Sequence, residues 1–201
     1  MVEKKSVHTY GLTNLDEKQL KLIERIINES ELEWNDAVLS EEDGKQKENP
    51  SYRSCKTSFL DVGDELTELF GKLILDYNLN YSGWNFDLEF IEAVQLCDYH
   101  EGDFYNWHID SFDNPYQYHP EKPYNRKVSV TIFLNDPEEY EGGEFDLETR
   151  GPNWDGDRFK TFKLPKGSMI VFPSYMWHRV RPVTSGVRKS LVLWIQGPPF
   201  K

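Results

Sequence analysis

The chain has 201 residues, of which 38% are hydrophobic and 14% aromatic, so it can support one sizeable hydrophobic core. Its 35 acidic and 23 basic side chains give a formal net charge of −12. Such a surface repels the phosphate backbone of nucleic acids, and we expect no nucleic-acid partner.

Targeting and redox signals are weak in this sequence. Cys55 and Cys97 form neither a CxxC pair nor a disulfide framework. The polar residues 1–10 do not resemble a signal peptide, and the chain has no run of about 18 apolar residues. The sequence therefore predicts a cytoplasmic protein without membrane contact.

The first part of the chain has the apolar spacing of two amphipathic helices. Asn14 is placed to cap the first helix and Asp64 to open the second. Between them, residues 40–51 are polar and include Gly and Pro, which favours a solvated loop. One hypothesis is that this loop is a lid over a substrate; an ordinary surface loop explains the composition equally well.

From Phe86 onward, short runs of β-branched and aromatic residues end at Gly, Pro, Asn or Asp. Strands at this spacing favour a sandwich or a barrel. Helices followed by strands predict an α+β domain whose helices cover one face of a jelly roll. We expect a single domain over residues 1–201, with helical support and a substrate-side loop in 1–85 and the jelly-roll core in 86–197.

Three side chains are candidate metal ligands. His108 and Asp110 are two residues apart, which in extended backbone points both to the same face. His178 follows a later strand-like run, SMIVFPSY. Two imidazoles and one carboxylate form the facial triad of Fe(II) oxygen chemistry, whereas the HExxH helix of many zinc hydrolases is missing. His100 and His119 lie nearby, but their positions favour solvated side chains.

The run VRKSLVLWI (187–195) places Arg188, Ser190, Val192 and Trp194 on one strand face. If that face is the barrel interior, Arg188 is a buried cation that needs a carboxylate, and a dicarboxylate cosubstrate supplies one in bidentate geometry. A structural salt bridge, or an outward arginine beside Lys189, is the alternative, and strand parity alone does not decide between them.

Five ordered motifs resemble the prolyl 4-hydroxylase branch of the 2-oxoglutarate oxygenases, and the last two also resemble the bacterial PKHD-type hydroxylases. The resemblance covers residues 90–196, roughly half the chain. The motifs are YHEGDFYNWHID (99–110), RKVSVTIFLND (126–136), EGGEF (141–145), FPSYMWHRVRP (172–182) and RKSLVLW (188–194).

This resemblance implies a cupin-like double-stranded β-helix that binds Fe(II) through His108, Asp110 and His178. It also implies that 2-oxoglutarate chelates the metal, pairs its C5 carboxylate with Arg188 and contacts the hydroxyl of Tyr99. Dioxygen is the co-reactant, succinate and CO2 are the co-products, and ascorbate is the expected activator. One departure is a phenylalanine at 133, where oxygen-sensing relatives carry a second cosubstrate-binding tyrosine.

Three further positions match residues that frame the substrate proline in prolyl hydroxylases: Tyr105, Arg126 and Trp194. The resemblance therefore implies hydroxylation of a prolyl residue in a peptide or protein. Tyr and Trp are also common core residues, and an arginine at a strand start is often part of a structural pair. A small-molecule or non-prolyl side-chain hydroxylase, and a jelly-roll binding module without turnover, remain open alternatives.

Overall fold

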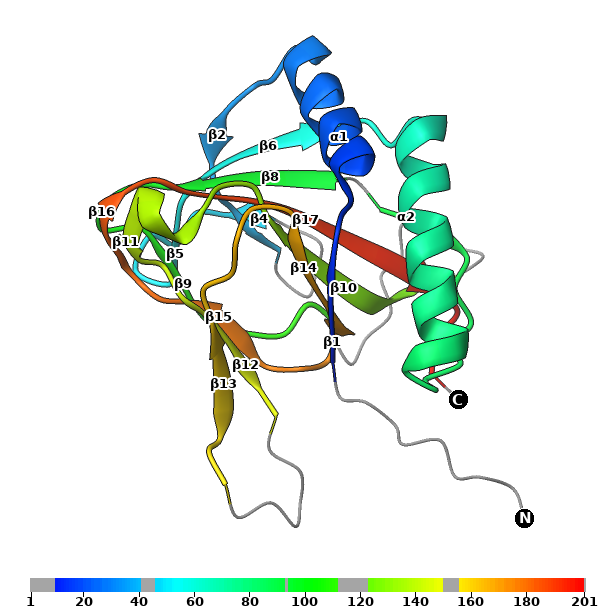
Figure 1. Cartoon of the computed structure of the whole chain (residues 1–201). Helices are drawn as coiled ribbons and strands as arrows, with labels where there is room; N and C mark the ends of the chain where they lie inside the picture. Colours follow the sequence, from blue (N-terminus) through cyan, green and yellow to red (C-terminus); the bar gives the residue numbers. More distant parts are fainter. Residues whose placement is uncertain (1–9, 41–45, 93, 112–122, 150–155, 201) are drawn as a thin grey trace.

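The computed structural model describes residues 10–40, 46–92, 94–111, 123–149 and 156–200, which are drawn as coloured ribbon in Figure 1. Within these ranges the strands form an eight-stranded sheet, a five-stranded sheet and two pairs of short strands, and every pairing is antiparallel. The prediction of a β-rich domain with two N-terminal helices is confirmed.

The large sheet forms the centre of the molecule, and seven of its strands follow one another edge to edge while the eighth, β7, pairs with β17. In spatial order the strands are β1 (Gly11–Asn14), β14 (Ser168–Pro173), β10 (Asn125–Phe133), β17 (Arg188–Gly197), β8 (Val94–Tyr99), β6 (Lys56–Leu60) and β2 (Asn35–Asp36), with β7 at Phe90–Ile91.

The small sheet carries strands from both halves of the chain, and in Figure 1 its labelled strands β12, β13 and β15 lie at the lower left. Its order is β13 (Phe159–Phe162), β12 (Phe145–Glu148), β15 (His178–Val180), β9 (Phe104–His108) and β5 (Arg53–Ser54). The two short pairs are β11 (Tyr140–Gly142) with β16 (Val183–Gly186), and β3 (Leu39–Ser40) with β4 (Gln46–Lys47).

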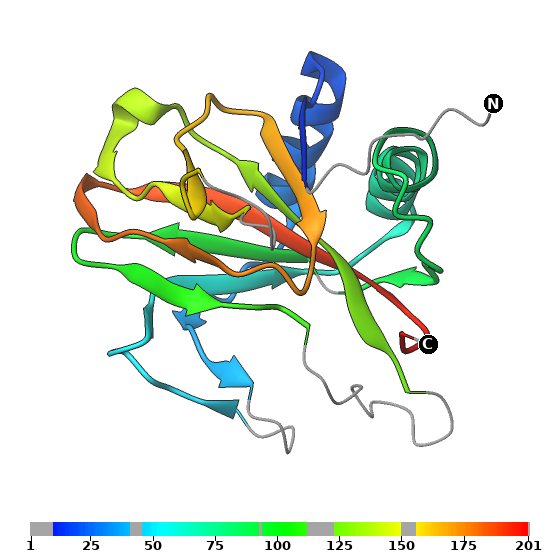
Figure 2. The same ribbon diagram turned by 90° about the horizontal axis from the view of Figure 1, so that it is seen from below.

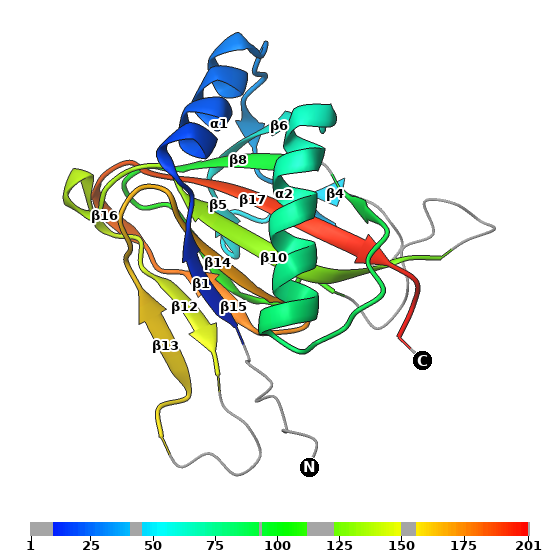
Figure 3. The ribbon, with the colours of Figure 1, turned by 45° about the vertical axis from the view of Figure 1, so that its right-hand side comes forward.

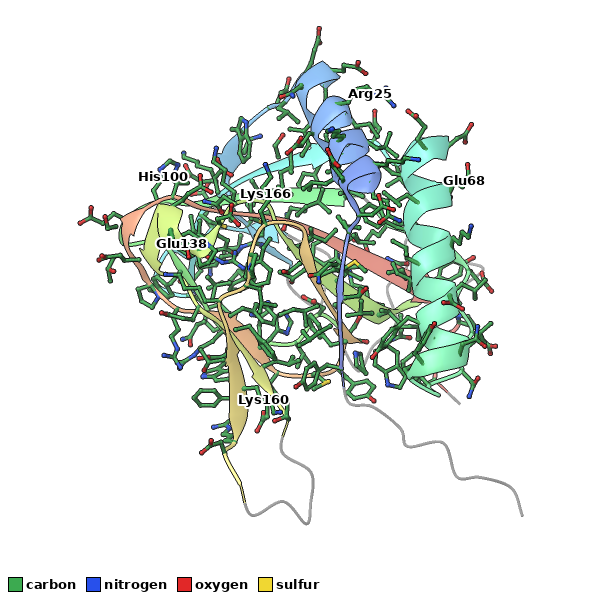
Figure 4. The ribbon with its side chains drawn as sticks, viewed as in Figure 1. Arg25, Glu68, His100, Glu138, Lys160 and Lys166 are labelled. Carbon is green, nitrogen blue, oxygen red and sulfur yellow. The ribbon has the colours of Figure 1, made fainter. Side chains whose placement is uncertain are left out.

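Two α-helices, α1 (Glu17–Glu29) and α2 (Asp64–Asp76), lie on the same side of the large sheet, as Figures 2 and 3 show. A π-helical turn (Tyr77–Tyr81) extends α2, and a 3-10 turn covers Pro137–Glu139. The outward faces carry charged side chains such as Arg25 and Glu68, which are labelled in Figure 4. No helix among the described residues has both the length and the apolar character needed to cross a membrane.

Strand alternation divides the apolar residues into two cores, one on each face of the large sheet. The outer core lies between this sheet and the helices, where Ile23, Phe70 and Ile74 meet Val128, Val130 and Ile132. Each such side chain contributes about 1.5–3 kcal/mol on full burial. The inner core lies between the two sheets, with these buried members: Ala37, Cys55, Cys97, Tyr99, Phe133, Phe145, Leu147, Phe162, Ile170, Phe172, Val180 and Val183.

The N-terminal region differs from the expectation in three respects. Asp16, and not Asn14, caps α1, because Asp16 and Gln19 exchange hydrogen bonds of 2.9 Å in a capping box while Asn14 ends β1. Residues before 86 also supply strands to both sheets, including β1, β5 and β6. The expected loop at 40–51 contains β4; residues 41–45, the centre of the lid hypothesis, lie outside the described residues.

Candidate active site

A cavity of about 590 Å³ opens between the two sheets and is lined by candidate residues from both. The small sheet supplies His108 and His178, and the large sheet supplies Arg188 and Trp194. The alternation predicted for the run 187–195 is confirmed, because Arg188, Val192 and Trp194 line this cavity while Leu191, Leu193 and Ile195 belong to the outer core.

His108, Asp110 and His178 are brought together at one wall of the cavity. In the pairing of β9 with β15, His108 and His178 are direct partners, and their ring centroids are 4.0 Å apart. Asp110 lies two residues beyond the end of β9, with its carboxylate oxygens 3.8 Å from Nε2 of His108 and 3.4 Å from Nε2 of His178. One potential ligand atom from each residue lies within 4.8 Å of the others.

Both imidazole rings are oriented by the same backbone contact. The Nδ1 atom of His108 lies 2.8 Å from the carbonyl oxygen of Asn106, and that of His178 lies 2.9 Å from the carbonyl oxygen of Met176. Since a carbonyl only accepts, each Nδ1 carries the hydrogen and donates it. In the neutral form of each ring, Nε2 then carries the lone pair, which points toward Asp110 and is available to a metal.

Burial tunes the charges of this cluster. Burial, together with the neighbouring His178, lowers the pKa of His108 well below its usual value, so this ring is neutral at neutral pH. Burial alone would raise the pKa of Asp110, but His178, His108 and Arg126 and a hydrogen bond from Ser129 lower it to about 2. A buried carboxylate beside a neutral imidazole is suited to a divalent cation.

Arg188 is a buried cation in the same cavity, with 1% of its surface exposed. Its Nη1 donates to Oγ of Ser190 at 2.9 Å, while Nε and Nη2 are buried and have no hydrogen-bond partner within the described part of the chain. No ion pair to a carboxylate is formed there either, and the outward orientation considered above is wrong. Two unsatisfied N–H donors on a buried guanidinium fit a carboxylate that comes from a ligand.

Aromatic rings surround the guanidinium of Arg188. Its Cζ atom is 5.3 Å from the ring centroids of both Tyr99 and Phe133, and Tyr99 is its direct partner in the pairing of β17 with β8. Tyr99 lines the cavity and is 3% exposed. Thr131, which lies on the same face of β10 as Phe133, also lines the cavity. The sequence-predicted cosubstrate residues thus lie together.

Gly143 and Tyr140 also contact this region and had no role in the sequence-based assignment. Gly142 and Gly143 both have a positive φ, and the strands on either side, β11 and β12, belong to different sheets. A Cβ atom on Gly143 would lie 3.0 Å from Cδ of Arg188 and 3.2 Å from Cε2 of Tyr140. The Tyr140 hydroxyl is buried without a partner among described residues.

The cavity wall beyond the triad carries the three residues expected to contact substrate. The ring of Tyr105 stacks on that of His108, with centroids 3.5 Å apart and planes 14° apart. The guanidinium of Arg126 lies 3.9 Å from the Trp194 ring centroid. Glu92, which the sequence did not single out, accepts two hydrogen bonds from Arg126, one of them 2.7 Å long.

Of the two other histidines considered as ligands, His100 is not part of this cluster. His100 is exposed and lies at the edge of the molecule, where Figure 4 labels it. His119 lies outside the described residues.

Comparisons with known proteins agree with this geometry. A model of the "2OG-Fe(II) oxygenase superfamily" matches residues 94–196. A PKHD-type hydroxylase from Hyphomonas neptunium is 46% identical over 98 residues, which are 48% of this chain and 39% of that protein. The chain therefore matches less than half the length of this relative.

Solved structures show the same fold. A prolyl-4-hydroxylase from Pseudomonas putida aligns with a TM-score of 0.67 and 22% identity, covering 96% of this chain and 94% of the other. A Trichoplax adhaerens prolyl hydroxylase, in complex with a peptide fragment of the oxygen degradation domain of hypoxia inducible factor, aligns with a TM-score of 0.63 and 18% identity over 93% and 83% of the two chains.

The architecture is thus the double-stranded β-helix that the resemblance implies, because the chain shares the fold of these solved structures. The family match covers half of the chain and spans both imidazoles, the carboxylate and the buried guanidinium. This chain belongs to the 2OG-Fe(II) oxygenase superfamily, whose members use Fe(II), 2-oxoglutarate and O2.

Proposed function

We propose that this chain is a 2-oxoglutarate-dependent Fe(II) dioxygenase in which His108, Asp110 and His178 hold the metal. One observation carries the proposal: a buried His-Asp-His cluster with both Nε2 lone pairs directed inward shares a cavity with an arginine that has no carboxylate partner among the described residues. Structural ion pairs do not leave a buried guanidinium in this state.

The donor atoms fit Fe(II). Two neutral imidazole nitrogens and one carboxylate give the 2-His-1-carboxylate set, which suits iron and leaves other metal positions open. Bound there, Fe(II) supplies the redox chemistry that couples the decarboxylation of 2-oxoglutarate to the hydroxylation of a substrate. The overall reaction consumes 2-oxoglutarate, O2 and a substrate C–H bond, and it yields succinate, CO2 and an alcohol.

The surrounding residues fit 2-oxoglutarate. Nε and Nη2 of Arg188 are available to the C5 carboxylate, and the rings of Tyr99 and Phe133 enclose that end of the cavity. The hydroxyl of Tyr99 can supply a further hydrogen bond, whereas Phe133 cannot. The role of these side chains is to bind the dicarboxylate in one orientation and to exclude water from it.

For the substrate, we propose a prolyl residue in a peptide or protein. The solved structures with the same fold include proteins named prolyl hydroxylases, one of them with a bound peptide. In this chain, Tyr105 stacks on His108, and Arg126 lies over Trp194 while Glu92 holds it in place. An apolar prolyl ring suits the aromatic surfaces of Tyr105 and Trp194, and Arg126 can donate to a peptide carbonyl.

A small-molecule substrate is the second candidate, because the cavity volume of about 590 Å³ lies within the range of about 300–1,000 Å³ found for small-ligand sites. The two candidates differ in what gains oxygen. Proline-containing peptides and a set of small metabolites are incubated separately with the protein, Fe(II), 2-oxoglutarate and ascorbate, and analysed by mass spectrometry. A peptide gain of one oxygen at proline supports the first candidate; a gain only among metabolites supports the second.

Succinate formation tests the enzyme class itself. Wild-type protein is expected to release succinate from 2-oxoglutarate in the presence of Fe(II), and the His178→Ala variant is not. If the wild type binds Fe(II) and 2-oxoglutarate but releases no succinate with any substrate set, the chain is a binding module and the proposed activity is wrong.

A further inference from the structure

Two serines lie behind the Asp110 carboxylate, and both are completely buried. Ser129 belongs to β10 of the large sheet, and Ser174 follows β14 in the segment that leads to His178. The Oγ atom of Ser129 is 2.7 Å from Oδ2 of Asp110 and 2.8 Å from Oγ of Ser174. Hydroxyls are mostly exposed in proteins, so a completely buried and connected pair beside a ligand residue calls for an explanation.

The direction of these hydrogen bonds follows from the chemistry of the groups. An ionised carboxylate only accepts, so the single hydroxyl hydrogen of Ser129 is donated to Oδ2 of Asp110. In the hydrogen bond between the two serines, the Ser174 hydroxyl must then donate and the Ser129 hydroxyl oxygen must accept. The chain of donation therefore runs from Ser174 through Ser129 to one oxygen of Asp110.

The backbone of Ser174 also fixes the main chain of Asp110. Its carbonyl oxygen accepts from the N–H groups of Asp110, at 2.9 Å, and Ser111, at 3.0 Å, and its own N–H donates to the carbonyl oxygen of Lys127 at 3.0 Å. One residue thus connects the segment that carries Asp110, the strand that carries Ser129 and the segment that leads to His178.

We propose that Ser129 and Ser174 form a positioning dyad that fixes the orientation of the Asp110 carboxylate through Oδ2, the oxygen 3.4 Å from Nε2 of His178, and so limits this carboxylate to one metal position. This inference rests on the proposed metal site. A carboxylate that binds through one oxygen occupies one metal position, and one that binds through both occupies two. Because 2-oxoglutarate and O2 need the remaining positions, the dyad would keep the site open as well as strengthen metal binding.

Co(II) is a suitable probe, because its visible absorption depends on coordination number and geometry and can be read without turnover. The full chain is titrated with Co(II) as wild type and as Ser129→Ala, Ser174→Ala and the double variant. Ser82→Ala is the matched control: Ser82 is equally buried and donates to the carbonyl oxygen of Asn78 at 3.1 Å, but it does not line the cavity.

Ser129→Ala is expected to weaken Co(II) binding by roughly 10–100-fold and to change the absorption spectrum of the bound ion. Ser174→Ala should weaken it by a smaller factor, because its hydroxyl acts through Ser129. The double variant should bind no more weakly than Ser129→Ala, since the two effects are not independent. Ser82→Ala should match the wild type in both affinity and spectrum.

The outcomes separate this inference from the proposed function. If the wild type binds Co(II) and Ser129→Ala binds it with the same affinity and spectrum, the dyad has no positioning role while the metal site stands. Equal weakening by Ser82→Ala would mean that the effect is general destabilisation, and would also overturn the dyad. If the wild type binds no Co(II), the proposed metal site fails and the dyad with it. Should Ser129→Ala fail to fold, Ser174→Ala carries the same test.

Discussion

Replacing Arg188 by methionine should weaken cosubstrate binding without destabilising the protein. Methionine keeps an unbranched apolar chain next to Gly143 but removes the guanidinium. Two buried donors of Arg188, Nε and Nη2, have no partner in the described part of the chain. Each hydrogen bond that they make to a carboxylate is worth about 1.5–3 kcal/mol, so the two together give about 3–6 kcal/mol. Their loss should weaken 2-oxoglutarate binding by roughly 100-fold to 10,000-fold.

The effect on folding has a different sign. The variant loses the 2.9 Å bond from Arg188 to Ser190, which is worth about 1 kcal/mol, but it also removes a buried charge without a carboxylate partner among the described residues. Replacing buried charged groups by apolar ones is often neutral or stabilising by about 1–4 kcal/mol. The free energy of unfolding of the metal-free and cosubstrate-free protein should therefore stay the same or rise.

Calorimetric titration of 2-oxoglutarate into Mn(II)-loaded protein, with urea unfolding of the metal-free protein, measures both quantities. Arg179→Met is the control, because Arg179 pairs with Asp146 on the other face of the small sheet, at 2.7 Å. That variant should keep its cosubstrate affinity and lose some stability. If Arg188→Met binds 2-oxoglutarate within about threefold of the wild type, or unfolds several kcal/mol more easily, Arg188 is a structural residue and our reasoning fails.

Three further outcomes are expected. His178→Ala should abolish detectable Mn(II) binding in a titration, because the two remaining ligands hold the ion poorly. Gly143→Ala should lower the free energy of unfolding in urea by about 1–2 kcal/mol, since φ is +63° at this position. The variant should also bind 2-oxoglutarate more weakly but keep its metal affinity, since the new Cβ lies 3.0 Å from Cδ of Arg188. Burial raises the pKa of Asp146, but hydrogen bonds, the strongest from Arg181, lower that pKa overall below 3.8. The ion pairs of Asp146 therefore stabilise the fold above about pH 4, and this stabilisation is lost as the pH falls further. The Asp146→Asn variant should unfold more easily than the wild type at pH 6. Between pH 5 and pH 3, the urea midpoint of this variant should change less than that of the wild type. An equal change in both proteins would contradict this assignment.

Much of the site could be predicted from local spacing. The alternation in β17 predicted that Arg188 and Trp194 share one face. The structure shows that this is the inner face, because Leu191, Leu193 and Ile195 pack into the outer core. This pattern could not show that Arg188 has no carboxylate partner in the described part of the chain, because the partners of Arg188 depend on segments that are distant in sequence. Tertiary structure decides whether a buried charge is paired internally or awaits a ligand.

Other features left little signal in the sequence. The strand β1 has one buried and three exposed residues, and it becomes a strand only by pairing with β14. Ser129 and Ser174 are ordinary small residues in sequence, and their role follows only from their contact with Asp110. The cap of α1 was readable: Asp16 and Gln19 have the capping-box spacing, which is a stronger signal than the isolated Asn14.

The most direct test of the central claim is a crystal structure of this chain grown with Mn(II) and 2-oxoglutarate. Anomalous scattering should locate one Mn(II) bonded to Nε2 of His108, Nε2 of His178 and a carboxylate oxygen of Asp110, with the far carboxylate of 2-oxoglutarate against Arg188. Mn(II) bound away from these three side chains, or a dicarboxylate that leaves Arg188 without a partner, would contradict the account.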